Sequence, residues 1–255
     1  MWWKIYKREV GAYFQGPTLF VLAGIFLFLM GWFTIGMLAE FAEAYDNLSL
    51  QQTYDMKNLN ITEWVVRGFF SLLNFLMMFM IPLFSMRLFA EESRNRTLEA
   101  LLTCPVREGS VLAGKFLASL TILYALCGLC MIYPVLFEIY SEPEWPVIWT
   151  GWLGIALAVP AYLAFGVFAS TITENQIIAA FVGFTGLLFF YLVGDVTSSV
   201  EGFSGRLAEG LSINAHSAGF THGLIESADL FYFAVFTFFF LFLSREILAL
   251  RRWRT

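Results

Sequence analysis

The sequence predicts an all-α integral membrane protein that crosses the bilayer with six transmembrane helices. Of its 255 residues 59% are hydrophobic and only 14% are charged, and the mean hydropathy is +0.71. Soluble domains carry about 25% charged residues, so an ordinary soluble core is excluded. The apolar residues also form long runs without polar alternation, and such runs favour membrane helices over a β-barrel.

Six apolar runs are long enough to be spans. A helix rises about 1.5 Å per residue, so about 20 residues are needed to cross a hydrocarbon core about 30 Å thick. The expected spans form one transmembrane domain, 1–255, and cover residues 17–38, 65–89, 114–137, 148–172, 176–194 and 229–250. Only Thr173–Asn175 separate the fourth span from the fifth, which predicts a tight helical hairpin. Pro82, Pro134 and Pro160 lie inside spans and should bend their helices.

The distribution of Lys and Arg predicts the orientation. Twelve of the 15 basic residues lie in the N-terminal tail, in residues 87–115 and at the C-terminal end. Six spans place these three segments on one side of the membrane and the acidic loops on the other. Basic loops stay in the cytoplasm, so both termini are expected there. The outer segment 195–228 is rich in Gly and Ser, and we expect short helices that dip back toward the membrane.

Aromatic and basic residues mark the expected membrane interface. In residues 1–16 rings recur at helical spacing while basic side chains take another face, which predicts an N-terminal interfacial helix, the alternative being an ordinary juxtamembrane tail. Lys115 begins the third span and should keep its stem in lipid and its head in water. The residues assigned to the interface are Trp3, Lys4, Tyr6, Lys7, Arg8, Lys115, Arg251, Arg252 and Trp253.

A charged patch between spans two and three, residues 91–106, predicts a docking element for a soluble partner. A helix that starts near residues 93–95 places Leu98, Leu101 and Leu102 on one face, with charges of both signs around it. Pro105 then ends the helix. A solvated loop is the alternative, but it has no need of a leucine stripe. The predicted contact residues are Glu91, Glu92, Arg94, Arg96, Thr97, Leu98, Glu99, Leu101, Leu102, Pro105 and Val106.

The same patch fits an E-E-x-x-x-R pattern, which resembles the first motif of intramembrane CAAX-type proteases. Such a site needs histidines beside the carboxylates, and the chain has only His216 and His222. The expected topology places both on the far side of the membrane, and no Phe-x-x-x-His motif is present, so this alternative is weak. The two histidines, without nearby carboxylates, are also weak candidates for metal binding, and we expect a structural role.

Other motifs carry little chemistry. Residues 109–115, GSVLAGK, approach a phosphate-binding loop, but Phe116 replaces the hydroxyl residue that would bind Mg²⁺. Cys127 and Cys130 form a CxxC inside an apolar run, where two small buried residues are the simpler interpretation. Asn74, within span two, is expected to hydrogen-bond to another helix.

Residues 87–118, RLFAEESRNRTLEALLTCPVREGSVLAGKFLA, resemble the signature of ABC-2 type transporter permeases. The matching residues are Glu92, Arg96, Thr97, Leu98, Glu99, Leu101, Leu102, Pro105, Val106, Gly114 and Lys115. The C-terminal part resembles the gliding-motility-associated branch of these permeases, through Leu211–Ser212, Gly223–Ile225, Asp229 and Arg252–Trp253, although His216–Ala218 departs from its pattern.

The resemblance implies a non-catalytic permease subunit in which residues 91–106 form a cytoplasmic coupling helix seated on a separate ABC-type ATPase. It implies no cofactor on this chain, because ATP and Mg²⁺ would be bound by the ATPase. The other implied partners are a second permease half, membrane lipid and an auxiliary extracytoplasmic subunit, with no nucleic acid. A non-transporting membrane scaffold or anchor is the alternative from another class.

Overall fold

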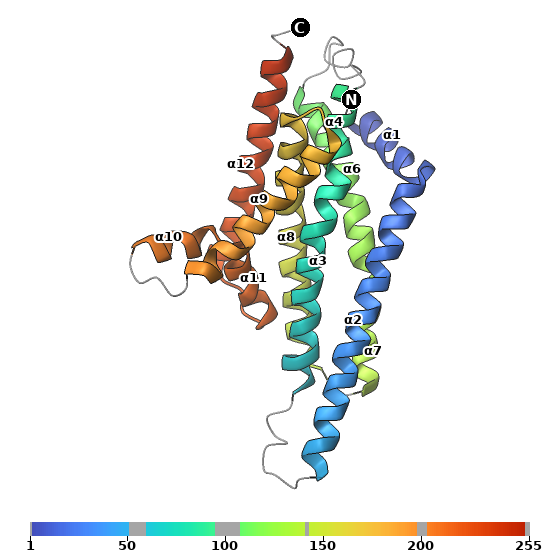
Figure 1. Ribbon diagram of the computed structural model, residues 1–255, viewed down its shortest axis with the longest axis vertical. Helices are drawn as coiled ribbons and strands as arrows, with labels where there is room; N and C mark the ends of the chain where they lie inside the picture. The colour runs from blue at the N-terminus through green and yellow to red at the C-terminus, as the bar shows by residue number, and fades with distance from the viewer. Residues whose placement is uncertain (1, 51–59, 95–107, 141–142, 198–202, 253–255) are drawn as a thin grey trace.

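The computed structural model describes residues 2–50, 60–94, 108–140, 143–197 and 203–252, and within these ranges the elements are helices joined by short connections (Figure 1). In chain order they are α1 (Trp2–Gln15), α2 (Pro17–Leu50), a π-helical turn η2 (Thr62–Val66), α3 (Arg67–Ser85), α4 (Arg87–Arg94), α6 (Glu108–Leu129), α7 (Ile132–Tyr140), α8 (Trp145–Ile172), α9 (Gln176–Thr197), α10 (Phe203–Leu211), α11 (Ile213–Thr221) and α12 (Ser227–Arg252).

Six helical segments of the described chain are long and apolar enough to cross a membrane, which confirms the predicted all-α membrane fold with six candidate spans. They are Pro17–Asp46, Thr62–Arg94, Glu108–Ile139, Trp145–Ile172, Gln176–Gly194 and Ser227–Arg251. The helix α1 and the C-terminal end of α12 lie at the same end of the bundle, which we call the terminal end (Figure 1). The long helix α2 reaches far beyond the other spans at the opposite end.

Local sequence explains where the observed helices depart from the predicted spans. The helix α2 continues from the predicted end at residue 38 to Leu50, because the continuation is rich in Ala, Leu and Glu and has no Gly or Pro after Gly36 to stop it. The third span is divided between α6 and α7 at a turn over Cys130–Met131. Pro134 lies four residues after Cys130, where its ring would clash with the Cys130 carbonyl in a straight helix.

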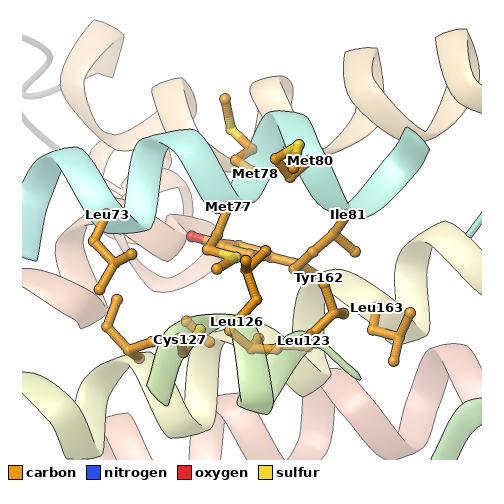
Figure 2. Close-up of a cluster of buried hydrophobic side chains, with 14 of the residues drawn as sticks. Leu73, Met77, Met78, Met80, Ile81, Leu123, Leu126, Cys127, Tyr162 and Leu163 are labelled. Carbon is orange, nitrogen blue, oxygen red and sulfur yellow. The ribbon is translucent and has the colours of Figure 1, made fainter. Parts of the chain in front are cut away.

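The core of the bundle is built on α3 and α8. Figure 2 shows Met77 and Ile81 of α3, Leu123 of α6 and Tyr162 of α8 in one buried layer. Glycines let other elements approach α8 closely: a Cβ on Gly154 would lie 2.7 Å from the Phe220 Cβ of α11. Small residues at crossings are the usual means of close helix packing in membranes.

The described residues of the segment 195–228, which is predicted to lie on the outer side, contain two short helices, α10 and α11. The helix α11 packs against α8, α9 and α3, and Figure 1 places it beside the middle of the bundle and not beyond its end. Short helices were expected here, and their depth in the membrane remains a prediction. Large apolar side chains, by contrast, are exposed along α2, α9 and α12, as lipid-facing or partner-facing helices require.

Candidate functional site

The described part of the predicted docking element is residues 91–94, the last turn of helix α4, and α4 follows α3 after a turn at Met86. It carries Glu91, Glu92 and Arg94; Glu91 and Arg94 are exposed, and Glu92 faces a buried cluster. The remaining predicted docking residues lie outside the described residues: Arg96, Thr97, Leu98, Glu99, Leu101, Leu102, Pro105 and Val106. The structure therefore describes the base from which the predicted docking segment extends.

Helix α4 is capped by a side chain from a different span. The backbone N–H groups of Phe89 and Ala90, in the first turn of α4, both donate to Ser170 Oγ of α8 at 3.1 Å. The Ser170 hydroxyl in turn donates to the carbonyl of Met86, also at 3.1 Å. The first N–H groups of a helix have no partner within it, so a buried helix start needs such a cap. Ser170 thereby fixes the turn between α3 and α4 on α8.

Lys115 ties α4 to α6 and α1. Its Nζ donates to Glu92 Oε1 and to the Leu88 carbonyl of α4, each at 2.8 Å, and lies 3.5 Å from Glu9 Oε1 of α1. The residue is only 2% exposed. The expected arrangement, with the ammonium head in water, is wrong because α1 covers the first turns of α6 and supplies a carboxylate there. A buried ammonium group requires such partners.

Helix α1 is held on α6 by polar contacts as well as by packing. The Tyr13 hydroxyl lies 2.9 Å from Ser119 Oγ, and burial raises the pKa of Tyr13 to about 12. The Tyr6 hydroxyl lies 3.2 Å from Thr121 Oγ1. Gly114 allows the close approach, since a Cβ there would lie 3.0 Å from Ile5 Cβ. Much of α1 therefore rests on protein, including the predicted interface residue Tyr6.

The basic face of α1 remains exposed. Trp3, Lys4, Lys7 and Arg8 are exposed, and the Lys7 ammonium lies 5.4 Å from the centre of the Trp3 ring. The Arg8 guanidinium contacts Glu9 Oε1 at 2.8 Å. That hydrogen bond is the main reason why the pKa of Arg8 is raised. These side chains are free to meet lipid headgroups, and their position in the membrane remains a prediction.

Arg251 joins the end of α12 to α4. Its Nη1 donates to Ser93 Oγ at 2.6 Å and its Nη2 to the Ile172 carbonyl at 3.3 Å, and Glu174 lies 3.9 Å away in the α8–α9 connection. This predicted interface residue is thus also a contact between helices. Arg252 is the last residue of α12, and Trp253 lies outside the described residues.

The histidines lie away from α4. His216 Nδ1 is 2.7 Å from Asp229 Oδ1, and its ring stacks on Tyr232 at 4.1 Å, so the expectation that no carboxylate lies nearby is wrong for His216. Asp229 and Arg251 are 22 positions apart on α12, about 33 Å along the helix axis. Arg251 contacts Ser93, which is next to Glu92, so the carboxylates of α4 lie at the Arg251 end of α12 and the His216–Asp229 pair lies at its other end. The His216–Asp229 pair and the α4 carboxylates therefore cannot form one protease site. No group of three potential metal ligands forms within the described ranges.

A buried polar network confirms the prediction for Asn74. Tyr162 of α8 donates to Asn74 Oδ1 at 2.8 Å, and Asn74 Nδ2 donates to Ser217 Oγ of α11 at 3.2 Å. His222, which caps the C-terminus of α11, lines a cavity of about 160 Å³ beside this network. The network links three helices at a depth where an unpaired amide would be costly.

Sequence reasoning missed Ser170 and Glu9, the partners that organise α4. Each carries a weak signal: Ser170 is a polar residue near the end of an apolar span, and Glu9 is an acid in a basic segment.

Comparison with known families identifies the family of the chain. The sequence pattern of the family described as ABC-2 family transporter protein matches residues 36–226, which is more than half of the 255-residue chain. The chain belongs to the ABC-2 transporter family. No curated protein matches it. The matched range begins within α2 and ends after α11, and it includes α4, Lys115 and Ser170. Membership in the family supports a membrane component of an ABC transporter.

Proposed function

We propose that the chain is the membrane-spanning permease subunit of an ABC-2 exporter, and that residues 91–106 dock on a separate ABC-type ATPase. The observation that carries the proposal is the attachment of α4. It is bonded to α8 through Ser170, to α6 through Lys115 and to α12 through Arg251. A segment that must pass motion to a helix bundle needs a base fixed to several helices in this way.

Under this proposal ATP and Mg²⁺ bind to the ATPase, and this chain supplies no catalytic residue. The ATPase changes shape on binding and hydrolysing ATP, and residues 91–106 follow it. Coupling requires that the docking segment bind differently in two ATPase states. The leucine stripe Leu98, Leu101 and Leu102 supplies apolar contact area, while charges of both signs set register and partner choice. The motion then reaches α6, α8 and α12 through the contacts of α4.

The proposal also covers the orientation of the chain in the membrane and its partner subunits. The basic terminal end faces the cytoplasm of a bacterial inner membrane, as the positive-inside rule favours. A second permease half pairs with this chain, which the exposed apolar faces of α2, α9 and α12 favour. The C-terminal resemblance favours a role in gliding motility, and an auxiliary subunit on the outer side would contact the α10–α11 region. The alternative function is a membrane scaffold or anchor without transport.

The proposal is tested by co-expressing the chain with the candidate ABC-type ATPases of the same genome. We expect Leu101→Glu/Leu102→Glu to insert in the membrane but to lose ATPase co-purification. Leu250→Glu is the matched control, because Leu250 is 65% exposed at the terminal end of α12, outside the docking segment. If the double variant keeps an intact, active complex, the docking proposal is wrong. If the wild-type chain binds the ATPase without any ATP-driven activity, the anchor alternative is favoured.

A further inference from the structure

A cleft at the terminal end has the composition of a lipid-binding site. It has a volume of about 440 Å³ and lies between α1, the first turns of α2, the end of α3, and α4. Ligand sites commonly have volumes of about 300–1,000 Å³. One part of the lining is apolar, from Leu19, Leu22, Leu83 and Phe84, and the other carries ionisable side chains. The first residues of candidate span one and the last of candidate span two contribute together, so in a membrane the cleft would lie near the boundary between hydrocarbon and headgroups.

Most of the ionisable groups in the cleft already have partners. Lys115 is bonded to Glu92 and lies close to Glu9, and Arg8 adds a second cation to this cluster. Two lining residues stand outside it, Arg87 and Glu91, which are both exposed. They lie four residues apart on α4 and so share one face of the helix. Arg87 donates to Thr18 Oγ1 at 2.9 Å, but no ion pair joins it to Glu91 or to another carboxylate of the described ranges.

We infer that this cleft binds one phospholipid with a zwitterionic, primary-amine headgroup, of the phosphatidylethanolamine type. The phosphate would accept hydrogen bonds from the Arg87 guanidinium, which suits phosphate geometry. The ammonium would donate to the Glu91 carboxylate. An acyl chain would follow Leu19, Leu22 and Leu83 toward the membrane core.

The lining distinguishes a primary amine from choline. A quaternary ammonium cannot donate hydrogen bonds and is held by cages of aromatic rings. Among the described residues that line the cleft, the aromatic ones are Tyr13 and Phe84, whose tilted rings have their centres 6.3 Å apart. The Tyr13 hydroxyl is also engaged with Ser119. A lone anionic lipid is disfavoured as well, because the described lining carries three carboxylates, which Arg87, Lys115 and the neighbouring Arg8 only balance, so there is no excess of positive charge.

The inference does not depend on an ATPase partner, since it concerns the free chain. The lipid would contact the start of α2 and α4 at the same time. The stability of α4, from which the docking segment continues, would then depend on which lipids the membrane contains.

The test is native mass spectrometry of the full-length chain, purified in detergent and titrated with phosphatidylethanolamine, phosphatidylcholine or phosphatidylglycerol of identical acyl chains. Wild type should bind one phosphatidylethanolamine about ten-fold more tightly than phosphatidylcholine, the size of one charge-assisted hydrogen bond. Glu91→Gln should abolish this preference. Arg87→Gln should weaken both zwitterionic lipids about ten-fold. The matched controls are Glu246→Gln and Arg245→Gln, exposed charges of α12 that do not line the cleft and should leave binding unchanged.

Two further arms separate the site from non-specific effects. Ala12→Trp fills the cleft from α1 without changing charge, and it should lower phosphatidylethanolamine binding while the protein remains monodisperse. Water-soluble glycerophosphoethanolamine should fail to displace the lipid, because it lacks the chains that contact the apolar lining. The inference is overturned if Glu91→Gln keeps the preference, if the controls lose it equally, if phosphatidylglycerol binds as tightly as phosphatidylethanolamine, or if the soluble headgroup competes fully.

Discussion

Replacing Lys115 by Met should strongly destabilise the terminal end of the bundle. Methionine has a similar shape but leaves Glu92 and Glu9 facing each other without the ammonium that now lies 2.8 Å and 3.5 Å from their Oε1 atoms. Breaking a buried ion pair by removing one partner costs about 3–5 kcal/mol. The side chains of Glu92 and Glu9 keep 20% and 15% exposure, and Arg8 remains 3.9 Å from Glu92, so we take the lower limit. For a chain of this size about 3 kcal/mol corresponds to a fall in Tm of about 6–12 °C.

The assay is thermal unfolding of the purified chain in one detergent, with Arg245→Met as an exposed control that should change stability by less than about 0.5 kcal/mol. A second variant separates loss of the ion pair from loss of packing. Lys115→Met/Glu92→Gln removes one of the two carboxylates that lose the ammonium and should recover part of the loss, as a double-mutant cycle measures. The reasoning is refuted if Lys115→Met lowers Tm by less than about 2 °C. It is equally refuted if the second substitution adds to the damage.

Two other predictions each compare a substitution at a contact between helices with the same substitution at a site without such a contact. Ser170→Ala should lower stability by about 1–3 kcal/mol, because the N–H groups of Phe89 and Ala90 lose their buried acceptor. Ser244→Ala should cost much less in the same thermal assay, since that buried hydroxyl only donates to the Phe240 carbonyl within its own helix. Gly114→Ala should loosen α1, measured as faster hydrogen exchange over Trp2–Gln15, because the new Cβ would press on Ile5. Gly128→Ala, with open space beside it, should leave α1 unchanged, and equal exchange in both variants would contradict the proposed α1–α6 contact.

The spans could be predicted because each depends on its own composition. A run of about 20 apolar residues forms a membrane helix whatever its neighbours are, since the bilayer leaves the backbone no other way to satisfy its hydrogen bonds. Helix ends were less predictable. Residues 39–50 continue α2 because they favour the helix even though the apolar run has ended. A hydropathy profile does not report helix propensity, so it placed the end of this helix too early.

The contacts of α4 could not be predicted, because they depend on which helix faces meet. Lys115 and Glu92 are 23 positions apart and Arg251 and Ser93 are 158 apart, and no periodicity relates such positions. Lys115 read alone is an ordinary interfacial lysine. Its burial depends on the packing of α1 over α6, and Gly114 permits this close packing. The sequence pattern of neither helix predicts it.

Polar contacts fix the register of this bundle because its apolar surfaces cannot. In a bilayer, lipid chains are as apolar as leucine, so packing of Leu and Phe alone gives helices little preference for one alignment. The described polar contacts occur at three levels: Lys115, Ser170 and Arg251 around α4, Asn74 with Tyr162 and Ser217 near the middle, and His216 with Asp229 toward the start of α12. The helix α8 contributes to the first two levels through Ser170 and Tyr162, about 12 Å apart along its axis. A displacement of α4 that keeps its Ser170 cap must therefore move α8, and with it the hydroxyl that holds Asn74.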